Sequence, residues 1–199
     1  MENAPPDLVR LLQAQGGLTA PEITAITRLW HHEHQLRRNE FLSTPDRTDR
    51  YLYFVLSGVL RIYCVNLSGE EVCLGFSYTH SLAGSYPSLI LQKPAAYFVQ
   101  AISPSRLLGI LWDDFVRLAA QFPNVERCRR MLSEDALIGR LQREIEMLSL
   151  TPAERYERFM QRSAHLFQLV PQKYIASYLN MSPETLSRIR NKKNTKVEF

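Results

Sequence analysis

The spacing of the hydrophobic residues changes from that of strands to that of helices near residue 113, and this change limits the folds open to the chain. Between about residues 34 and 111, short runs rich in aromatic and β-branched residues are separated by turn-forming residues. Residues 66–69, Asn-Leu-Ser-Gly, predict a hairpin turn between two of these runs. The pattern favours an antiparallel sandwich or barrel. The strand-like runs are RYLYFVLSGVLRIYCV (50–65), EEVCLGFSY (70–78), AAYFVQAI (95–102) and SRLLGILW (105–112).

Three segments have helical spacing instead. Residues 21–33 begin with a proline suited to a first helical turn, and residues 113–122 begin with two aspartates, which stabilise a helix N-terminus. Residues 124–150 predict a helix about 40 Å long at about 1.5 Å per residue. The sequence Thr-Pro-Ala-Glu at 151–154 predicts a capping box, so a new helical unit begins at residue 151.

Hydrophobic residues within 124–150 recur seven residues apart, as they do in a helix that packs against a second copy of itself. Glu134 interrupts this pattern, which covers about two heptads. The same residues also fit an amphipathic helix that packs on its own domain. The expected dimer seam consists of Met131, Ile138, Leu141, Ile145 and Leu148.

Positive charge is concentrated at the end of the chain. The 199 residues contain 24 Lys and Arg against 20 Asp and Glu. Residues 171–199 hold 6 of the basic and 2 of the acidic residues, so residues 1–170 hold 24 − 6 = 18 and 20 − 2 = 18 and are neutral. A basic end on a neutral body indicates a polyanionic partner, most often nucleic acid.

Several classes of protein are excluded or disfavoured. No hydrophobic run approaches the roughly 20 residues of a membrane helix, and no secretory signal is visible. Three scattered cysteines do not make a disulfide scaffold, so we expect a reduced cytoplasmic protein with no membrane partner. No pattern indicates an enzyme. Two alternatives stay open, namely a redox switch between Cys64 and Cys73 and a metal site at His31-His32-Glu33-His34.

Residues 171–190 meet the steric requirements of a helix-turn-helix. Ile175 and Leu179 supply the inner face of a first short helix. Asn180 suits a tight turn because asparagine tolerates the left-handed conformation, and Ser182 is placed to cap a second helix.

The second helix carries residue types that read DNA. Arginine can donate two hydrogen bonds to guanine and glutamate can accept one from cytosine, so base reading is assigned to Glu184 and Arg188. We expect Glu184, Thr185, Arg188 and Arg190 to lie along one side of the helix. Hydroxyl and basic side chains near a helix N-terminus hold phosphate. The expected phosphate contacts are Lys173, Ser182, Thr185, Arg190, Lys192 and Lys193.

These features resemble the Crp/Fnr (catabolite activator-like) family of bacterial transcription regulators along almost the whole chain. Residues 38–41, followed by the pattern Y-F-V-x-x-G-x-x-R-x-Y over 53–63, resemble the opening of the family's β-roll. Residues 124–150 resemble its dimerisation helix.

The segment SPETLSRI (182–189) resembles the family's recognition helix, whose usual form is S-R-E-T-hydrophobic-x-R-hydrophobic. The family's base-contacting glutamate and second arginine fall on Glu184 and Arg188, and Pro183 replaces its first arginine. The stretch around this helix is similar to a Bacteroidetes-type branch of the family.

The resemblance fails where the family binds cyclic nucleotides. The family uses a Gly-Glu pair for the ribose and an Arg-Ser pair for the phosphate. Here Ser85 follows Gly84, and two alanines replace Arg-Ser. A cyclic phosphate needs charge-assisted hydrogen bonds, so cyclic AMP is not the expected ligand, although Lys93 offers a partial substitute. The expected effector pocket consists of Gly84, Ser85, Tyr86, Ala95, Ala96 and Tyr97.

The resemblance implies an α+β fold in three parts. These are an antiparallel β-roll effector domain (1–123), a dimerisation helix (124–150) and a helix-turn-helix domain (151–199) whose β-hairpin wing is missing or reduced. We expect a homodimeric transcription regulator that places residues 182–191 in the major groove of double-stranded DNA. Its effector is unidentified, no cofactor is expected, and RNA polymerase is a further candidate partner. The alternative is a ligand-sensing or interaction module with a vestigial helix-turn-helix and no DNA function.

Overall fold

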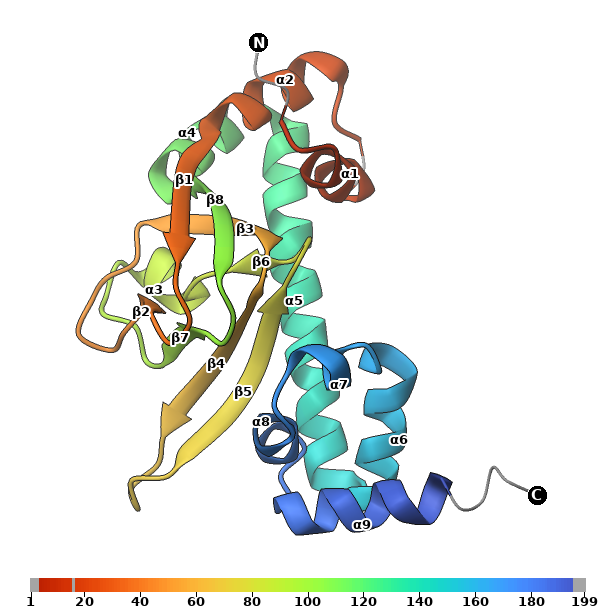
Figure 1. Ribbon diagram of the computed structural model, residues 1–199. Coiled ribbons are helices and arrows are strands. Elements are labelled where there is room, and N and C mark those ends of the chain that lie inside the picture. The colour runs from red at the N-terminus through yellow and green to blue at the C-terminus, as the bar shows by residue number, and fades with distance from the viewer. Residues whose placement is uncertain (1–3, 16, 195–199) are drawn as a thin grey trace.

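Two antiparallel sheets, one long helix and a group of short helices follow one another in the computed structural model, which describes residues 4–15 and 17–194 (Figure 1). One sheet has the order β1 (Trp30–Leu36), β8 (Ser105–Leu111), β3 (Tyr51–Ser57), β6 (Leu82–Ala83). The other has the order β2 (Phe41–Ser43), β7 (Phe98–Ala101), β4 (Val59–Val65), β5 (Glu71–Tyr78). All paired strands are antiparallel. The predicted α+β fold with an N-terminal antiparallel β-roll is confirmed.

The turns between β3, β4 and β5 form where the sequence predicts them. Gly58 separates β3 from β4 with φ of 100°, and a Cβ atom there would lie 2.6 Å from the carbonyl oxygen of Pro104. Gly69 closes the β4–β5 hairpin with φ of 84°, and its N–H donates to the Asn66 carbonyl oxygen at 3.0 Å. Only glycine adopts such positive φ angles without strain.

The pairing of β4 with β5 separates the two cysteines of the hairpin. Cys64 pairs with Val72, and Cys73 pairs with Tyr63. Since successive side chains along a strand point to opposite faces, the Cys64 and Cys73 thiols lie on opposite faces of the sheet. Cys73 is buried, and burial raises the pKa of its thiol to about 11. This geometry contradicts the redox-switch alternative, which needs the two thiols to face each other.

The N-terminal helices differ from the sequence expectation. Helix α1 (Pro6–Ala14) was not predicted, although Leu8 and Leu12 recur at helical spacing and are fully buried. The helix expected over residues 21–33 is α2 (Ala20–Leu29) and ends earlier. The expectation was wrong at this end because Trp30 starts strand β1, where pairing with β8 overrides helical propensity.

Two further helices complete the β-roll. Helix α4 (Trp112–Gln121) forms where the paired aspartates predict it. Helix α3 (Tyr86–Leu91) lies between β6 and β7, in the segment that the sequence assigned to the effector pocket, and it was not predicted. The N-terminal helices, α4 and the start of the long helix share one hydrophobic core with the roll, which includes Leu12, Phe54 and Phe115.

The long helix α5 spans Pro123–Ser149 and connects the roll to the C-terminal helices. These are α6 (Pro152–Ser163), α7 (Leu166–Leu169), α8 (Gln172–Tyr178) and α9 (Pro183–Asn194). The predicted capping box opens α6, since the Thr151 N–H donates to Glu154 Oε2 at 2.8 Å and the Glu154 N–H donates back to Thr151 Oγ1 at 3.4 Å. Within the described ranges, no helix combines the length and apolar character needed to cross a membrane.

The C-terminal helices pack on the β-roll of the same chain. A second hydrophobic core joins Val59 and Ile102 of the roll to Phe159, Ile175 and Leu186 of these helices. Figure 1 shows α8 beside the β4–β5 hairpin, while α9 lies at the far end of the molecule from α1. The β4–β5 hairpin of the roll therefore packs against the C-terminal helices.

Candidate functional site

The turn between α8 and α9 has the geometry that a helix-turn-helix requires. Asn180 adopts φ of 51°, and the Met181 N–H donates to the Ala176 carbonyl oxygen at 3.0 Å. The Thr185 N–H donates to Ser182 Oγ at 3.2 Å, so Ser182 caps α9 as the sequence predicts. Leu186 is fully buried and anchors α9 to α8.

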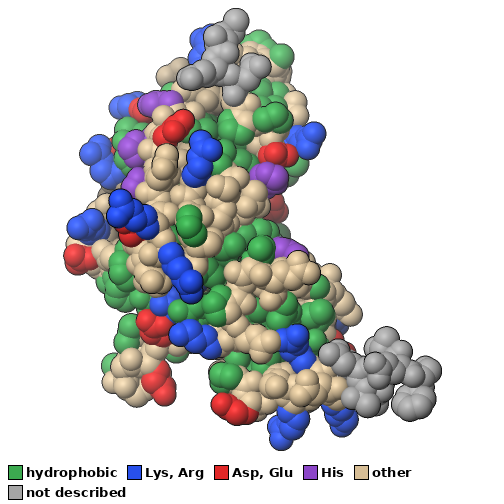
Figure 2. Space-filling model, in the orientation of Figure 1, with side chains coloured by type: hydrophobic (Ala, Val, Ile, Leu, Met, Phe, Trp, Pro, Cys, Tyr) green, Lys and Arg blue, Asp and Glu red, His purple; other side chains and the backbone are tan. Residues whose placement is uncertain are grey.

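One face of α9 is exposed and mixes charged with polar side chains. Glu184, Ser187, Arg188 and Asn191 are exposed and line one shallow surface hollow. Figure 2 shows acidic and basic side chains along the lower edge of the molecule, where α9 lies. Hydrogen bonds from its own backbone N–H and from Ser182 lower the pKa of Glu184. This carboxylate is ionised at neutral pH and can accept a hydrogen bond. Sequence reasoning missed Ser187 and Asn191, although their spacing from Glu184 places them on its face.

Arg190 does not share this face, so the expectation that it lies beside Glu184 and Arg188 was wrong. It is half-buried, and its guanidinium carbon lies 4.9 Å from the ring centre of Phe167 in α7. The reason is helical geometry, because two residues at about 100° each turn Arg190 to the opposite side from Arg188.

The other expected phosphate contacts surround the N-terminal end of α9 or follow its last turns. Ser182 and Lys192 are exposed, and Thr185 is half-buried. Lys173 is exposed on α8, and its Nζ lies 4.9 Å from the Tyr174 ring centre. The Lys193 side chain and residues 195–199, on which the expectation about the wing falls, lie outside the described residues.

Buried Arg155 of α6 holds the turn in place. Its guanidinium donates to the carbonyl oxygens of Leu179 and Leu150 at 2.8 Å each, and to that of Asn180 at 3.1 Å. Carbonyl groups at helix ends lack partners within the helix, so one cation satisfies the ends of both α5 and α8. Sequence reasoning missed this residue because its partners are carbonyl groups, which carry no sequence signal.

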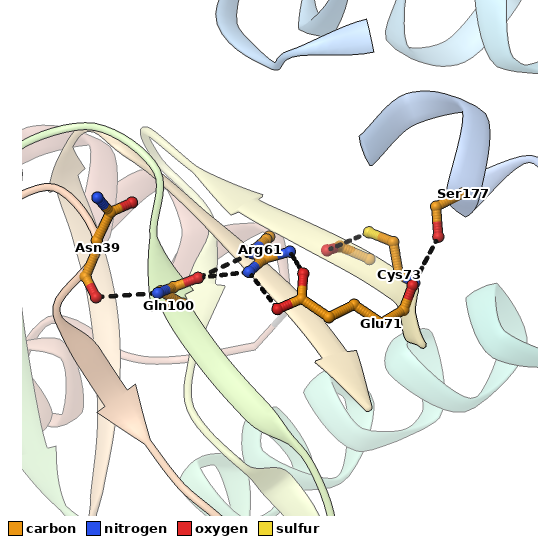
Figure 3. Close-up of polar contacts among 7 residues, drawn as sticks. Asn39, Arg61, Glu71, Cys73, Gln100 and Ser177 are labelled. Carbon is orange, nitrogen blue, oxygen red and sulfur yellow. Dashed lines mark hydrogen bonds and ion pairs between the residues drawn. The ribbon is translucent and has the colours of Figure 1, made fainter. Parts of the chain in front are cut away.

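Arg61 of β4 joins the roll to α8 (Figure 3). Its guanidinium donates to Gln100 Oε1 at 2.7 and 2.9 Å and to the Glu71 carboxylate at 2.5 and 3.2 Å. Its central carbon lies 4.0 Å from the Tyr63 ring centre and 4.3 Å from that of Tyr174 in α8. The arginine of the family-like pattern over residues 53–63 is therefore an interdomain contact.

Helices α5 and α8 meet at one point of strand β5. The Cys73 N–H donates to Ser177 Oγ of α8 at 2.9 Å (Figure 3). From α5, Arg143 donates to the Tyr178 carbonyl oxygen at 2.9 Å, and Arg140 donates to that of Leu74 at 3.0 Å. We call this three-way contact the β5 junction.

The expected dimer seam is solvent-exposed in the single chain. Ile138, Leu141, Ile145 and Leu148 are 51%, 49%, 63% and 82% exposed, while Met131 is half-buried. Exposed apolar side chains on one helix mark an interaction surface. The alternative in which this part of α5 packs on its own domain does not account for these exposures.

A cavity of about 460 Å³ lies between the β-roll and α5. Three of the expected pocket residues, Gly84, Tyr86 and Tyr97, line it. The other three do not: Ser85 and Ala95 are buried, and Ala96 is exposed. Sequence reasoning missed the contribution of α5, because the cavity forms between segments far apart in the chain. The α5 residues that line it are Arg129, Leu132, Ser133, Ala136, Leu137 and Arg140.

The residues of this cavity do not fit a cyclic phosphate. Of the described residues that line it, two are cationic, and both already have partners. Arg129 donates to both carboxylate oxygens of Glu126 at 2.6 and 2.7 Å, and Arg140 donates to the β5 junction. The neighbouring loop holds a carboxylate, since Asp49 accepts from the Ser85 N–H at 2.8 Å and burial raises the pKa of Asp49.

The alternative of a metal site at residues 31–34 rests on histidines of strand β1. His32 and His34 share one face of β1, and the His32 ring stacks on Tyr51 with ring centres 4.2 Å apart. Burial and the neighbouring His32 lower the pKa of His34. No group of three or more potential metal ligands occurs within the described ranges.

The sequence is similar to a known domain family and to several transcription regulators. Residues 33–122 match the cyclic nucleotide-binding domain family. The fumarate and nitrate reduction regulatory protein of Yersinia pestis is 23% identical over 188 residues, which cover 86% of this chain and 72% of the relative. The transcriptional activator protein Anr of Pseudomonas protegens is 24% identical, with 86% and 74% covered.

Solved structures share the fold along most of the chain. FixK2 from Bradyrhizobium japonicum superposes with a TM-score of 0.71 at 19% identity, covering 83% of this chain and 85% of that one. The catabolite activator protein of Thermus thermophilus superposes with a TM-score of 0.57 at 20% identity, covering 94% and 87%.

Proposed function

This chain is a homologue of the Crp/Fnr-type transcription regulators and carries a cyclic nucleotide-binding domain, and from that premise we propose that it is a homodimeric, sequence-specific DNA-binding transcription regulator. The relatives are named as regulators and not as enzymes, which supports a non-enzymatic role. We assign residues 1–123 to an effector domain, 124–150 to a dimerisation helix and 151–199 to DNA binding. The Bacteroidetes-type branch stays a prediction.

The exposed face of α9 is the observation that carries this proposal. Glu184 and Arg188 stand one helical turn apart on the surface, next to a capped helix N-terminus that favours phosphate. In a helix-turn-helix, this part of the second helix enters the major groove. We assign base reading to Glu184 and Arg188 and phosphate contacts to Ser182, Lys173 and Lys192.

The first test is to select bound duplexes from a random DNA pool with wild type, Arg188→Ala and Lys192→Ala. We expect wild type to enrich a two-fold symmetric motif with half-sites about 34 Å apart. Arg188→Ala should lose about 1–3 kcal/mol on that site and blur one position of each half-site. Lys192→Ala is the matched control, and it should weaken all sequences equally and reduce the salt dependence.

Enrichment of no motif by wild type, at low and at moderate salt, would instead favour the alternative of a ligand-sensing module without DNA function. A change of sequence preference in Lys192→Ala would contradict its assignment as a phosphate contact.

The dimer requires a separate test on α5. Replacing Leu141 with glutamate places a charge in the middle of the seam, and burying it unpaired is unfavourable. We therefore expect Leu141→Glu to be a monomer by sedimentation equilibrium and to bind one half-site weakly. Gln142→Glu, next to it on the same helix and also exposed, should stay a dimer. Equal dimerisation of both variants would contradict the seam.

A further inference from the structure

We propose that the cavity between the β-roll and α5 binds a mainly apolar small molecule with one O–H or N–H donor, and that it does not bind a cyclic nucleotide. This inference deepens the proposed function. The regulatory use of the site rests on the proposed function, whereas binding of the ligand does not depend on it.

Apolar side chains form most of the cavity wall. Both sheets, helix α4 and helix α5 contribute large hydrophobic side chains, and the volume of about 460 Å³ lies in the range of roughly 300–1,000 Å³ that small-molecule sites have. A ligand gains affinity here by leaving water, in proportion to its apolar surface. The apolar lining consists of Leu52, Ile62, Leu74, Leu82, Ala83, Pro87, Trp112, Phe115, Leu132, Ala136 and Leu137.

Most polar side chains of the lining already form hydrogen bonds within the protein. Ser77 Oγ donates to the Leu82 carbonyl oxygen at 2.9 Å. Arg129 is held by Glu126, and Arg140 by the β5 junction. Among the lining residues that the structure describes, Glu126 neutralises Arg129, and the exposed Arg140 is the one cation without a carboxylate partner. A phosphate would lose its water against mainly apolar walls and meet a single exposed cation, so the cavity favours an apolar ligand over a charged one.

The Tyr86 hydroxyl offers a hydrogen-bonding position to a ligand. The hydroxyls of Tyr86 on α3 and Ser133 on α5 are hydrogen-bonded to each other. Ser133 Oγ donates its proton to the Arg129 carbonyl oxygen at 2.9 Å, so the Tyr86 hydroxyl must donate to Ser133. The Tyr86 oxygen then offers lone pairs and no proton, so the matching ligand group is a donor.

The cavity also touches the parts of the chain that a ligand would need to move. Leu74 lines the cavity and follows Cys73 of the β5 junction directly. Leu137 lines it beside Ile138 of the dimer seam. A bound ligand shifts the helices only if its affinity differs between two arrangements, so the residues that connect the cavity to the β5 junction and to the dimer seam are those through which it would act.

The test is a fluorescence titration of the full chain with N-phenyl-1-naphthylamine, a neutral probe with three aromatic rings and a single N–H. Wild type should give a saturable rise in fluorescence with one probe per chain, and millimolar cyclic AMP should not displace the probe. Ala136→Trp fills the cavity from α5 and should weaken probe binding more than tenfold. Gln142→Trp, on an exposed part of α5 that does not line the cavity, should bind as wild type does.

Tyr86→Phe removes the acceptor and keeps the wall, so it should weaken the probe about three- to tenfold. Absence of saturable binding to wild type, equal binding to Ala136→Trp, or displacement by cyclic AMP would overturn the proposal. Unchanged affinity in Tyr86→Phe would overturn the assignment of the donor group.

Dimerisation and DNA binding are measured on the same samples without the probe, and circular dichroism checks that each variant is folded. Failure of DNA binding with intact probe binding would overturn the proposed function and leave this inference standing.

Discussion

Replacing Arg155 with methionine is expected to lower the free energy of unfolding of the C-terminal helices by about 3 kcal/mol, since a hydrogen bond to a charged group contributes roughly 1.5–3 kcal/mol. The substitution removes the donor from three carbonyl oxygens, those of Leu150, Leu179 and Asn180. Methionine fills the space but leaves these groups without a partner. Urea unfolding followed by far-UV circular dichroism measures the loss.

Arg158→Met is the matched control for this substitution. Arg158 lies on the same helix, and its side chain is exposed. Exposed substitutions usually change stability by less than about 0.5 kcal/mol. Equal stability of the two variants would contradict the role of Arg155 in holding the turn.

Replacing Arg61 with methionine is expected to loosen α8 from the roll, with a loss of about 2–3 kcal/mol. The guanidinium is 5% exposed, whereas the Glu71 carboxylate is 48% exposed, so water can solvate Glu71 but not the Gln100 oxygen that loses its donor. The ring of Tyr174 also loses the guanidinium of Arg61. Native-state hydrogen exchange should show faster exchange of the α8 amides.

Arg106→Met tests whether this effect is specific. Arg106 is an exposed arginine of β8, in the other sheet of the roll. Its loss should leave exchange in α8 unchanged. If Arg61→Met changed the stability of the roll without affecting α8, the interdomain contact would be wrong and the residue would serve the roll alone.

Preferences of neighbouring residues in the sequence predicted much of the fold. They failed where segments far apart in the sequence pack together. The hairpin at residues 66–69 and the capping box at Thr151 follow from neighbours in sequence. The end of α2 at Leu29 does not, because strand pairing with β8 decides it. Helix α3 was missed because a short helix of six residues has little periodicity of its own.

The same division applies to the candidate site. Asn180 and Ser182 carry their conformational preferences in their side chains, so the turn before α9 was predictable. The roles of Arg61 and Arg155 were not, since their partners lie 10 to 39 and 5 to 25 residues away. The α5 residues that line the cavity were not predicted either, because they are far in sequence from the β-roll residues that they face.

The reactivity of the buried Cys73 thiol reports on local opening of strand β5, to which α8 is hydrogen-bonded. The Cys73 backbone N–H is bonded to Ser177 of α8, the residue is 2% exposed, and the raised pKa of its thiol keeps the reactive thiolate scarce. A reagent reaches this sulfur only when the structure around it opens locally, whereas Cys64, on the opposite face of the sheet, is half-buried. The rate of labelling at Cys73 therefore reports local opening of β5 and of the helix α8 that is hydrogen-bonded to it.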